Sequence, residues 1–357
     1  ERIPVYPAAS GYGQATDFAL MASNESPEPP LEAVVDAARM ALLGVNRYPD
    51  PSNTRLREAL AARYGLPASR IQIGNGSCDI LLAAGEALLE EGAEIVYAWP
   101  SFSVYPHLAA ASGARAIAVP LNDRDEHDLD AMLAQITAAT QLVLVCNPNN
   151  PTSTALPLGD IARFAEQVPD HVCVILDEAY CEYNTLEDPD ASIALLDRHP
   201  NLVLLRTFSK VYGLCGLRVG YALCGSDRFV TATTQVRQPF FCNAAAQAAA
   251  VEALRHQDAI SARVERAVVA RMTLEDGLRE LGLTVADSQA NFVWCGLPVA
   301  DGGDAAAEEQ RVLTGLAERG YQVRAGGALG RAGWLRVSFG TPAQNDGFLA
   351  AMRELVA

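Results

Sequence analysis

The sequence predicts an α/β protein whose larger domain is built on a mostly parallel sheet that helices cover on both faces. Between residues 54 and 255, short β-rich runs alternate with longer segments rich in Ala, Leu and Glu, the pattern of repeated strand–helix units. The short runs are almost continuously apolar, as in strands buried on both faces. The chain has 357 residues, half of them apolar, which is enough for two domains.

The elements of the larger domain follow from where these runs stop at Pro, Gly, Asp or Asn. The predicted strands are residues 94–98, 116–119, 141–146, 172–176, 202–205 and 219–223. Helical periodicity predicts covering helices over residues 54–64, 80–89 and 244–254. Asn53 or Thr54 is available to cap the first of these helices.

A second, smaller domain is expected after residue 260. A long charged helical pattern over residues 262–281 leads into strands near 290–294, 322–324 and 334–339. The first 45 residues or so are rich in Pro and lack a strand series, so they cannot form a core alone and should pack against the C-terminal region. We therefore expect a large domain of residues 46–260 and a small α+β domain of residues 1–45 with 261–357.

The charge and the cysteines limit the function classes. With 27 basic and 43 acidic residues the formal net charge is −16, which repels both nucleic acid and an anionic membrane. The binding of a small anion depends on nearby positive side chains and N–H groups and not on the net charge, so a phosphate cofactor remains compatible with the sequence. The eight cysteines form no C-x-x-C pair and only five histidines are present, so no metal site is expected. Free thiols in apolar runs, no signal peptide and no membrane-spanning run indicate a soluble, cytoplasmic protein.

Polar residues follow three neighbouring strands of the predicted sheet. NPNNPT at 147–152 follows the third strand, DEAY at 177–180 the fourth, and RTFSK at 206–210 the fifth. Open parallel sheets bind ligands beyond the carboxyl ends of their strands. GNGS at 74–77 precedes a helix whose first N–H groups could hold a phosphate. Arg218 lies eight residues beyond Lys210.

Each of these pieces taken alone has an ordinary structural interpretation. GNGS and NPNNP are commonly turns, Asp177 could be a helix cap, Lys210 a solvated loop lysine and Arg218 half of a surface ion pair. Their order and their places at strand ends indicate one shared site.

The run of residues 206–221, RTFSKVYGLCGLRVGY, resembles the lysine segment of fold-type I pyridoxal-phosphate aminotransferases, specifically the histidinol-phosphate aminotransferase group. The resemblance covers nearly the whole chain, and further matching motifs occur in the order of that family. They are NESP at 24–27, RYPD at 47–50, GNGS at 74–77, PSFSVY at 100–105, NPNNPT at 147–152, DEAY at 177–180, SQANF at 288–292 and LRV at 335–337.

The resemblance implies an aspartate-aminotransferase-like fold and pyridoxal 5′-phosphate as the cofactor. Lys210 is similar to the lysine that binds this cofactor covalently and later moves the α-proton. Asp177 resembles the carboxylate that keeps the pyridine nitrogen protonated, which makes the ring an electron sink. Asn150 and Tyr180 resemble the pair that hydrogen-bonds the phenolic oxygen, and Phe102 the aromatic residue that stacks on the ring.

The remaining ligands are also carried over from the resemblance. The group that would hold the cofactor phosphate comprises Gly76, Ser77, Thr207, Ser209 and Arg218, and Cys78 is a further expected cofactor-binding residue. Tyr48 is similar to a tyrosine that reaches the phosphate of the neighbouring subunit, which implies a homodimer with a shared active site. Arg336 resembles the arginine that grips the substrate carboxylate, although a strand-edge ion pair is its ordinary interpretation. Asn24 and Arg324 lie in segments that line the same pocket.

Two departures bear on the substrate. Ser153 stands where Gly is usual and Cys78 where an acidic residue is frequent; neither removes a catalytic group, and both bring the chain closer to the phenylalanine or aromatic-amino-acid branch. An aromatic substrate needs an apolar slot, for which the candidates are Tyr6, Tyr12, Phe102 and Tyr105. Histidinol phosphate would instead need more positive donors, and two arginines, at 324 and 336, could serve either substrate.

The resulting hypothesis is ping-pong transamination from an aromatic L-amino acid such as phenylalanine to an oxo acid such as 2-oxoglutarate. The alternatives are a histidinol-phosphate aminotransferase and a threonine-phosphate-type decarboxylase on the same scaffold. A regulator that kept only ligand sensing would have lost Lys210 and Asp177 and gained a nucleic-acid-binding segment. The sequence keeps both residues and has no basic appendage.

Overall fold

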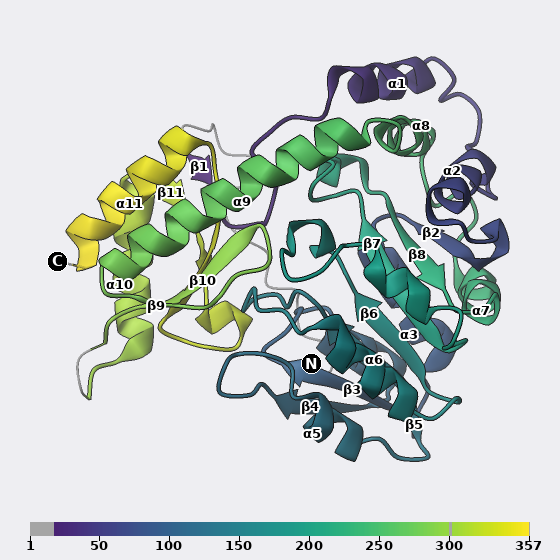
Figure 1. Cartoon of the computed structure of the whole chain (residues 1–357), viewed down its shortest axis with the longest axis horizontal. Coiled ribbons are helices and arrows are strands. Elements are labelled where there is room, and N and C mark those ends of the chain that lie inside the picture. The colour runs from purple at the N-terminus through teal and green to yellow at the C-terminus, as the bar shows by residue number, and fades with distance from the viewer. Residues whose placement is uncertain (1–17, 300–301, 357) are drawn as a thin grey trace.

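The computed structural model describes residues 18–299 and 302–356, and its larger part is a twisted seven-stranded sheet (Figure 1). The strands lie in the order β2-β8-β7-β6-β5-β3-β4. Their bounds are β2 Ile71–Gly74, β3 Glu94–Trp99, β4 Arg115–Pro120, β5 Thr140–Cys146, β6 Cys173–Asp177, β7 Leu202–Thr207 and β8 Gly220–Cys224. β8 runs antiparallel to both of its neighbours, β2 and β7, and all other pairs in this sheet are parallel. The six predicted strands are confirmed; β2, four residues long, was missed.

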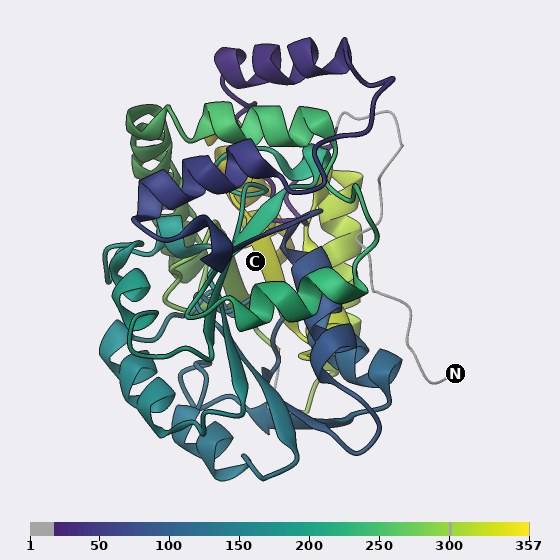
Figure 2. The ribbon, with the colours of Figure 1, turned by 90° about the vertical axis from the view of Figure 1, so that its right-hand side faces the viewer.

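Helices cover both faces of this sheet, as the sequence predicts (Figure 2). Alternate strand residues fall into two buried clusters, Val143 and Val145 in one and Leu142 and Leu144 in the other, because successive side chains of a strand point to opposite faces. The first cluster includes residues of α2 Thr54–Tyr64, α5 Leu129–Ala134, α6 Leu158–Gln167 and α8 Ala244–Ala253. The second includes residues of α3 Ser77–Leu88, α4 Tyr105–Ser112 and α7 Arg228–Val236.

The predicted cap of α2 differs in the structure. Asn53 occupies the cap position with a left-handed backbone, φ 51°, and its side chain makes no capping bond. The carboxylate of Asp50 accepts from the amides of Ser52 and Thr54 instead, at 2.9 and 2.7 Å. An acidic side chain from the preceding turn thus satisfies the first amide of the helix, that of Thr54.

The smaller part of the molecule is an antiparallel sheet with three long helices. The sheet order is β12-β13-β10-β9. The bounds are β9 Thr284–Val285, β10 Phe292–Gly296, β12 Arg324–Ala325, β13 Trp334–Ser338, α9 Gln257–Glu280, α10 Ala305–Glu318 and α11 Pro342–Val356. Short 3₁₀ turns complete the elements, namely η1 Ala68–Arg70, η2 Cys181–Tyr183, η3 Ala191–Leu195, η4 Cys215–Leu217 and η5 Gly327–Leu329.

The N-terminal segment contacts both parts of the molecule. β1 Ala19–Leu20 pairs in parallel with β11 Tyr321–Gln322 of the smaller part. α1 Glu32–Leu42 lies along α8 of the larger part (Figure 1). The division into residues 46–260 and 1–45 with 261–357 stays a prediction.

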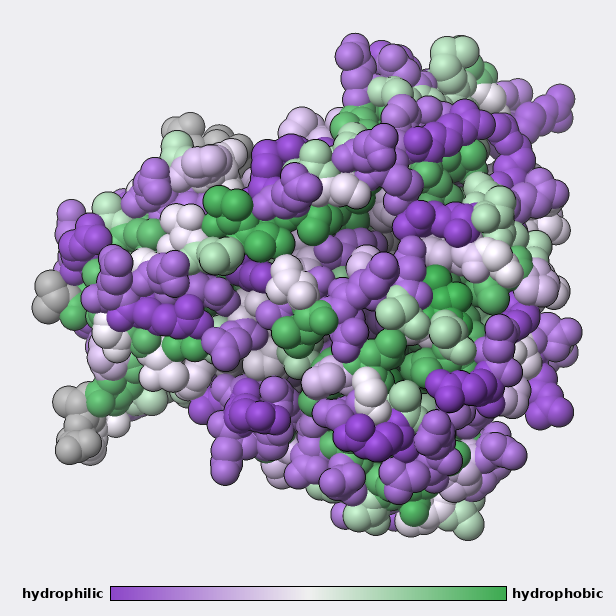
Figure 3. All heavy atoms as spheres, viewed as in Figure 1, coloured by the Kyte–Doolittle hydropathy of each residue, from purple (hydrophilic) through white to green (hydrophobic). Residues whose placement is uncertain are grey.

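The structure also describes the surface, the cysteines and the groups that could bind a metal. On the face shown in Figure 3, hydrophilic residues dominate and apolar ones form separate small patches. Among the helices of the described chain, none is long and apolar enough to cross a membrane. All eight cysteines are free thiols. Within residues 18–299 and 302–356, no group of three His, Cys, Asp or Glu could hold a metal ion.

Candidate active site

A cavity of about 380 Å³ lies where β5, β6 and β7 end and the smaller part of the molecule meets the sheet, within the usual size range of small-molecule sites. Thirteen of the residues that the sequence proposed for cofactor or substrate line it, while Gly76, Tyr48 and Tyr105 do not. The lining residues among them are Asn24, Ser77, Cys78, Phe102, Asn150, Asp177, Tyr180, Thr207, Ser209, Lys210, Arg218, Arg324 and Arg336.

Lys210 enters this cavity from the loop after β7. Its Nζ donates to the backbone oxygen of Ser23 at 3.4 Å and lies 5.6 Å from the ring centre of Tyr180. Burial, reinforced by the nearby positive charge of Arg336, lowers the pKa of Lys210 to about 8. A substantial fraction of this amine is therefore neutral near pH 8, the form that can attack a carbonyl carbon.

Asp177 is the last residue of β6 and is 3% exposed. Its Oδ2 accepts from the hydroxyl of Tyr105 at 2.9 Å and its Oδ1 from the amide of Ala179 at 3.3 Å. Burial raises the pKa of this carboxyl to about 6, while the two hydrogen bonds act in the opposite direction. Asp177 is thus a buried carboxylate whose ionised form depends on a few neighbours.

Tyr180 and Asn150 face the cavity with their acceptor atoms already engaged. The hydroxyl of Tyr180 accepts from Nδ2 of Asn24 at 3.0 Å, and Oδ1 of Asn150 accepts from Nη1 of Arg336 at 2.5 Å. Each side chain keeps donor hydrogens for a further oxygen. Burial raises the pKa of the Tyr180 hydroxyl, so it stays protonated. These are the properties of a pair that donates to a phenolic oxygen.

Asn24 reaches Tyr180 because residues of the smaller part hold its backbone. Asn24 has a left-handed conformation, φ 54°. Its amide donates to the hydroxyl of Ser338 at 2.8 Å, and its carbonyl accepts from Nδ2 of Asn291 at 3.0 Å. Asn291, inside the SQANF motif, was not assigned a role from the sequence.

An anion-binding cup occupies one end of the cavity. Gly76 precedes the first turn of α3, with φ 82°, and a Cβ atom there would collide with the guanidinium of Arg218. Arg218 donates to the hydroxyl of Ser209 at 3.3 Å. The amides at the start of α3, the hydroxyls of Thr207 and Ser209 and one arginine are a donor set for a phosphate. The residues present therefore fit the phosphate of pyridoxal phosphate.

Of the aromatic residues proposed for a substrate slot, the structure places one on the cavity wall and one away from it. Phe102 lines the cavity. Tyr105 does not: it is fully buried behind Phe102, with the two ring centres 5.7 Å apart at 86°. The prediction that Tyr105 belongs to an apolar substrate slot is therefore wrong, because its position at the start of α4 turns its hydroxyl toward Asp177. Tyr6 and Tyr12 lie outside the described residues.

The structure adds residues that sequence reasoning did not assign to the site. Glu25 and Cys215 stand inside motifs that had been recognised, so those motifs were the available signal. Leu329 comes from the turn η5 of the smaller part, which no motif marked. The unassigned lining residues are Ala22, Ser23, Glu25, Ser103, Cys146, Ala179, Cys215, Gly216 and Leu329.

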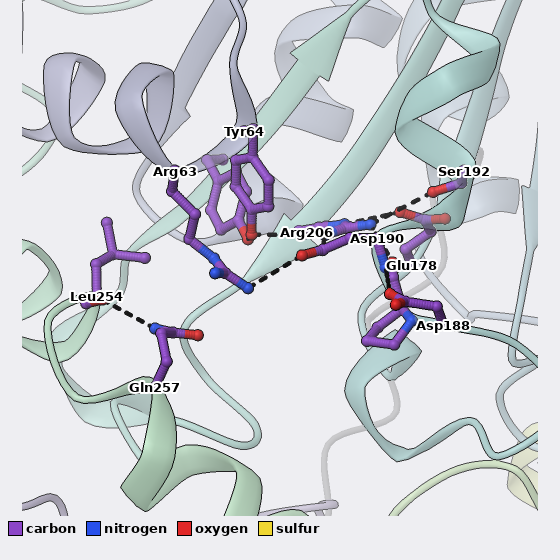
Figure 4. Close-up of polar contacts among 11 residues, drawn as sticks. Arg63, Tyr64, Glu178, Asp188, Asp190, Ser192, Arg206, Leu254 and Gln257 are labelled. Atoms are coloured by element: carbon purple, nitrogen blue, oxygen red, sulfur yellow. Dashed lines mark hydrogen bonds and ion pairs between the residues drawn. The ribbon is translucent and has the colours of Figure 1, made fainter.

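A buried ion network lies behind the ends of β6 and β7 (Figure 4). Arg206, 2% exposed, donates through Nε to Glu178 at 2.8 Å and through Nη1 to Asp190 at 2.7 Å. Its Nη2 also bonds Ser192, and Nη1 approaches the hydroxyl of Tyr64 at 3.5 Å. Arg206 and Glu178 adjoin Thr207 and Asp177, so this network fixes the backbone that carries two site residues.

Tyr48 lies outside the cavity of its own chain. It is 81% exposed and stacks on Phe240, with ring centres 4.4 Å apart. Tyr48 is therefore free on the surface for a contact with another molecule.

The comparisons agree with this geometry. The chain matches the family "Aminotransferase class I and II" over residues 16–352, and it belongs to that family, whose members depend on pyridoxal phosphate and share fold type I. It is 43% identical to the aromatic amino acid aminotransferase of Rhodococcus jostii, over 98% of this chain and 93% of that one.

Two further relatives carry the name of the alternative substrate. Histidinol-phosphate aminotransferase 2 of Ralstonia nicotianae is 41% identical, over 99% of this chain and 93% of that protein. The histidinol-phosphate aminotransferase of Sinorhizobium meliloti, solved in complex with pyridoxal-5′-phosphate, superposes with a TM-score of 0.86 at 30% identity. That comparison covers 95% of this chain and 90% of the solved one. Both names therefore occur among similar proteins.

Proposed function

We propose that this aminotransferase binds pyridoxal 5′-phosphate on Lys210 and moves the amino group of an aromatic L-amino acid, such as phenylalanine, to 2-oxoglutarate or another oxo acid. One observation supports the cofactor assignment most directly. Lys210, Asp177 and the anion-binding cup around Arg218 line a single cavity. A covalent tether, a partner for a ring nitrogen and a phosphate site are thus within reach of one small molecule.

The residues divide the chemistry among them. When bound, the cofactor supplies an aldehyde carbon that takes up the substrate amine and a ring that accepts the electron pair of the broken Cα–H bond. Lys210 Nζ would be the base that takes the proton from the substrate Cα and carries it as an ammonium group within the site. Asp177 would hold a proton on the ring nitrogen, and Tyr180 would donate to the phenolic oxygen. Arg336 holds the substrate carboxylate, which orients the Cα–H bond.

The aromatic preference is supported by the relatives and by the pocket walls. Relatives that are 40–43% identical bear the name aromatic amino acid aminotransferase. Phe102 and Leu329 place apolar surface on the cavity, and an aromatic ring gains free energy by covering it.

Histidinol phosphate is the second candidate substrate. Arg324 and Arg336 both line the cavity and are about nine-tenths buried, and two arginines suit a phosphate ester as well as a carboxylate. Similar proteins also carry this name. A decarboxylase on the same scaffold would differ in which Cα bond breaks.

A single-turnover experiment separates these candidates. The purified, cofactor-loaded protein is mixed with L-phenylalanine or with L-histidinol phosphate, and the loss of the visible absorption band is followed. We expect rapid loss with phenylalanine and little with histidinol phosphate. The reverse result would assign the second substrate. Release of carbon dioxide without a 2-oxo acid would contradict transamination.

We further propose a homodimer in which Tyr48 of each chain reaches the phosphate in the other chain's cavity. Tyr48 follows a stretch of exposed apolar residues, among them Met40, Leu43 and Val45, which are 62–78% exposed. Exposed apolar surface of this kind is typical of an interface.

A further inference from the structure

One contact of Asp177 has no place in the mechanism described above. The hydroxyl of Tyr105 donates to Asp177 Oδ2 at 2.9 Å, and Tyr105 is fully buried. The ring of Tyr105 also packs edge-on against Phe102, 5.7 Å between centres. One side chain therefore touches the carboxylate for the ring nitrogen and the aromatic ring that lines the same cavity.

The fold places Tyr105 there. β3 and β6 are separated by β5 in the sheet, and Cys146 of β5 pairs in register with Asp177. Tyr105 begins α4 after the turn that follows β3, and its amide donates to the carbonyl of Phe102 at 3.0 Å. The hydroxyl of Tyr105 therefore meets a carboxylate at the end of β6, two strands away from β3.

The charge state of Asp177 depends on few groups. Burial favours the neutral acid, and the adjacent Glu178 acts in the same direction. The hydrogen bonds from Tyr105 and the Ala179 amide and the positive charge of Lys210 favour the ionised form. The thiols at positions 78 and 146 are neutral, since burial raises their pKa values.

We propose that Tyr105 is a positioning residue that keeps Asp177 ionised and fixes its Oδ2, so that this carboxylate can hold the proton on the cofactor's ring nitrogen. The proposal rests on the proposed function. The competing interpretation is that Asp177 is only the acceptor that a buried phenol requires. The two differ in what happens to Asp177 when the hydroxyl is removed and the ring is kept.

The first test uses the protein without cofactor, so it does not depend on activity. Tyr105→Phe removes only the hydroxyl, and infrared difference spectra against Asp177→Asn report the protonation of Asp177 across pH. We expect the pKa of Asp177 to rise by about one pH unit, a roughly tenfold change in proton affinity. Tyr221→Phe is the matched control, because Tyr221 is equally buried and its hydroxyl bonds Tyr64 at 2.6 Å; its spectra should equal wild type.

The second test uses the loaded protein. With cofactor labelled with ¹⁵N in the ring, nuclear magnetic resonance reports the proton on that nitrogen. Tyr105→Phe should lower its occupancy and slow the first half-reaction by about tenfold, with the dissociation constant of the amino acid little changed. An unchanged Asp177 pKa, or a shifted one with unchanged ring protonation, would overturn the proposal. A failure of amino donors to bleach wild-type protein would instead contradict the proposed function.

If Tyr105→Phe does not fold, a variant with a stronger hydrogen-bond donor at position 105 still tests the proposal. 3-Fluorotyrosine at position 105 keeps the ring and strengthens the hydrogen-bond donor. The pKa of Asp177 should then fall below the wild-type value. No change with this stronger donor would also refute the positioning role.

Discussion

At the scale of single residues, the lowered pKa of Lys210 has a consequence for cofactor uptake. The neutral Nζ attacks the aldehyde carbon and water leaves, so the rate follows the neutral fraction of this amine. With a folded-state pKa of about 8, that fraction rises roughly tenfold per pH unit below pH 8 and levels off above it. An ordinary lysine would level off only above ~10.4.

We therefore predict that the rate of pyridoxal phosphate capture by the cofactor-free protein rises from pH 6 and reaches a plateau above about pH 8, measured by stopped-flow absorbance. Arg336→Gln removes a positive charge that lowers this pKa and should move the profile to higher pH. A wild-type profile that still rises steeply at pH 10 would contradict the assignment of Lys210 as a buried amine.

Lys210 itself gives the most direct test of the site. Lys210→Ala should leave the protein folded and able to bind the cofactor by its phosphate, but without the visible band of a lysine-bound cofactor and without transamination. Absorption spectra and circular dichroism measure the two properties together. Lys210 is the only lysine in the sequence, so persistence of the band in the variant would contradict a lysine-bound cofactor.

At the scale of elements, the Arg206 network determines how firmly the ends of β6 and β7 are held (Figure 4). Glu178 and Arg206 have side chains that are 6% and 2% exposed. Removal of one partner leaves a buried charge without compensation, which typically costs about 3–5 kcal/mol. When Arg206 is the residue removed, the hydroxyls of Ser192 in η3 and Tyr64 at the end of α2 also lose a hydrogen-bond donor.

We predict that Arg206→Met lowers the free energy of unfolding by about 3 kcal/mol or more, measured by urea denaturation of the cofactor-free protein. The control is Arg39→Met, whose pair with Asp36 is exposed, with side chains 71% and 55% accessible, and which should change stability by less than about 1 kcal/mol. Equal effects of the two substitutions would show that the network adds no stability of its own.

At the scale of the whole molecule, the proposed dimer makes a prediction about mixtures. Tyr48→Phe removes the hydroxyl for the neighbouring phosphate, and Lys210→Ala removes the tether. In a mixed dimer, the site with Lys210 receives Tyr48 from the other chain and is intact. Random exchange should then restore about a quarter of the wild-type sites.

The measurement is transaminase activity at low cofactor concentration, before and after the two variants are mixed and allowed to exchange subunits. Activity above that of either variant supports the shared site. If Tyr48 acts within its own chain, mixing only dilutes the Tyr48→Phe protein, and activity falls in proportion.

The sequence determined the local and repetitive features of this protein. Short, almost continuously apolar runs specified six strands of the large sheet, since burial on both faces leaves a pattern visible without tertiary information. Motifs after two strands placed Lys210 and Asp177 at one edge of the sheet, because parallel strands bring their carboxyl ends together, and Arg218 was proposed from its place in the same run as Lys210. The short strand β2 was not predicted, because four residues carry too little periodicity.

Only the tertiary structure decided which side chains meet across long stretches of chain. Tyr105 was a candidate for a substrate-facing ring, yet its hydroxyl donates to Asp177, 72 residues away along the chain. Leu329 reaches the cavity and Asn291 holds Asn24 through the packing of the smaller part against the sheet. The physical reason is that a side chain's direction depends on the turn that carries it and on close packing around it, neither of which leaves a pattern in the sequence.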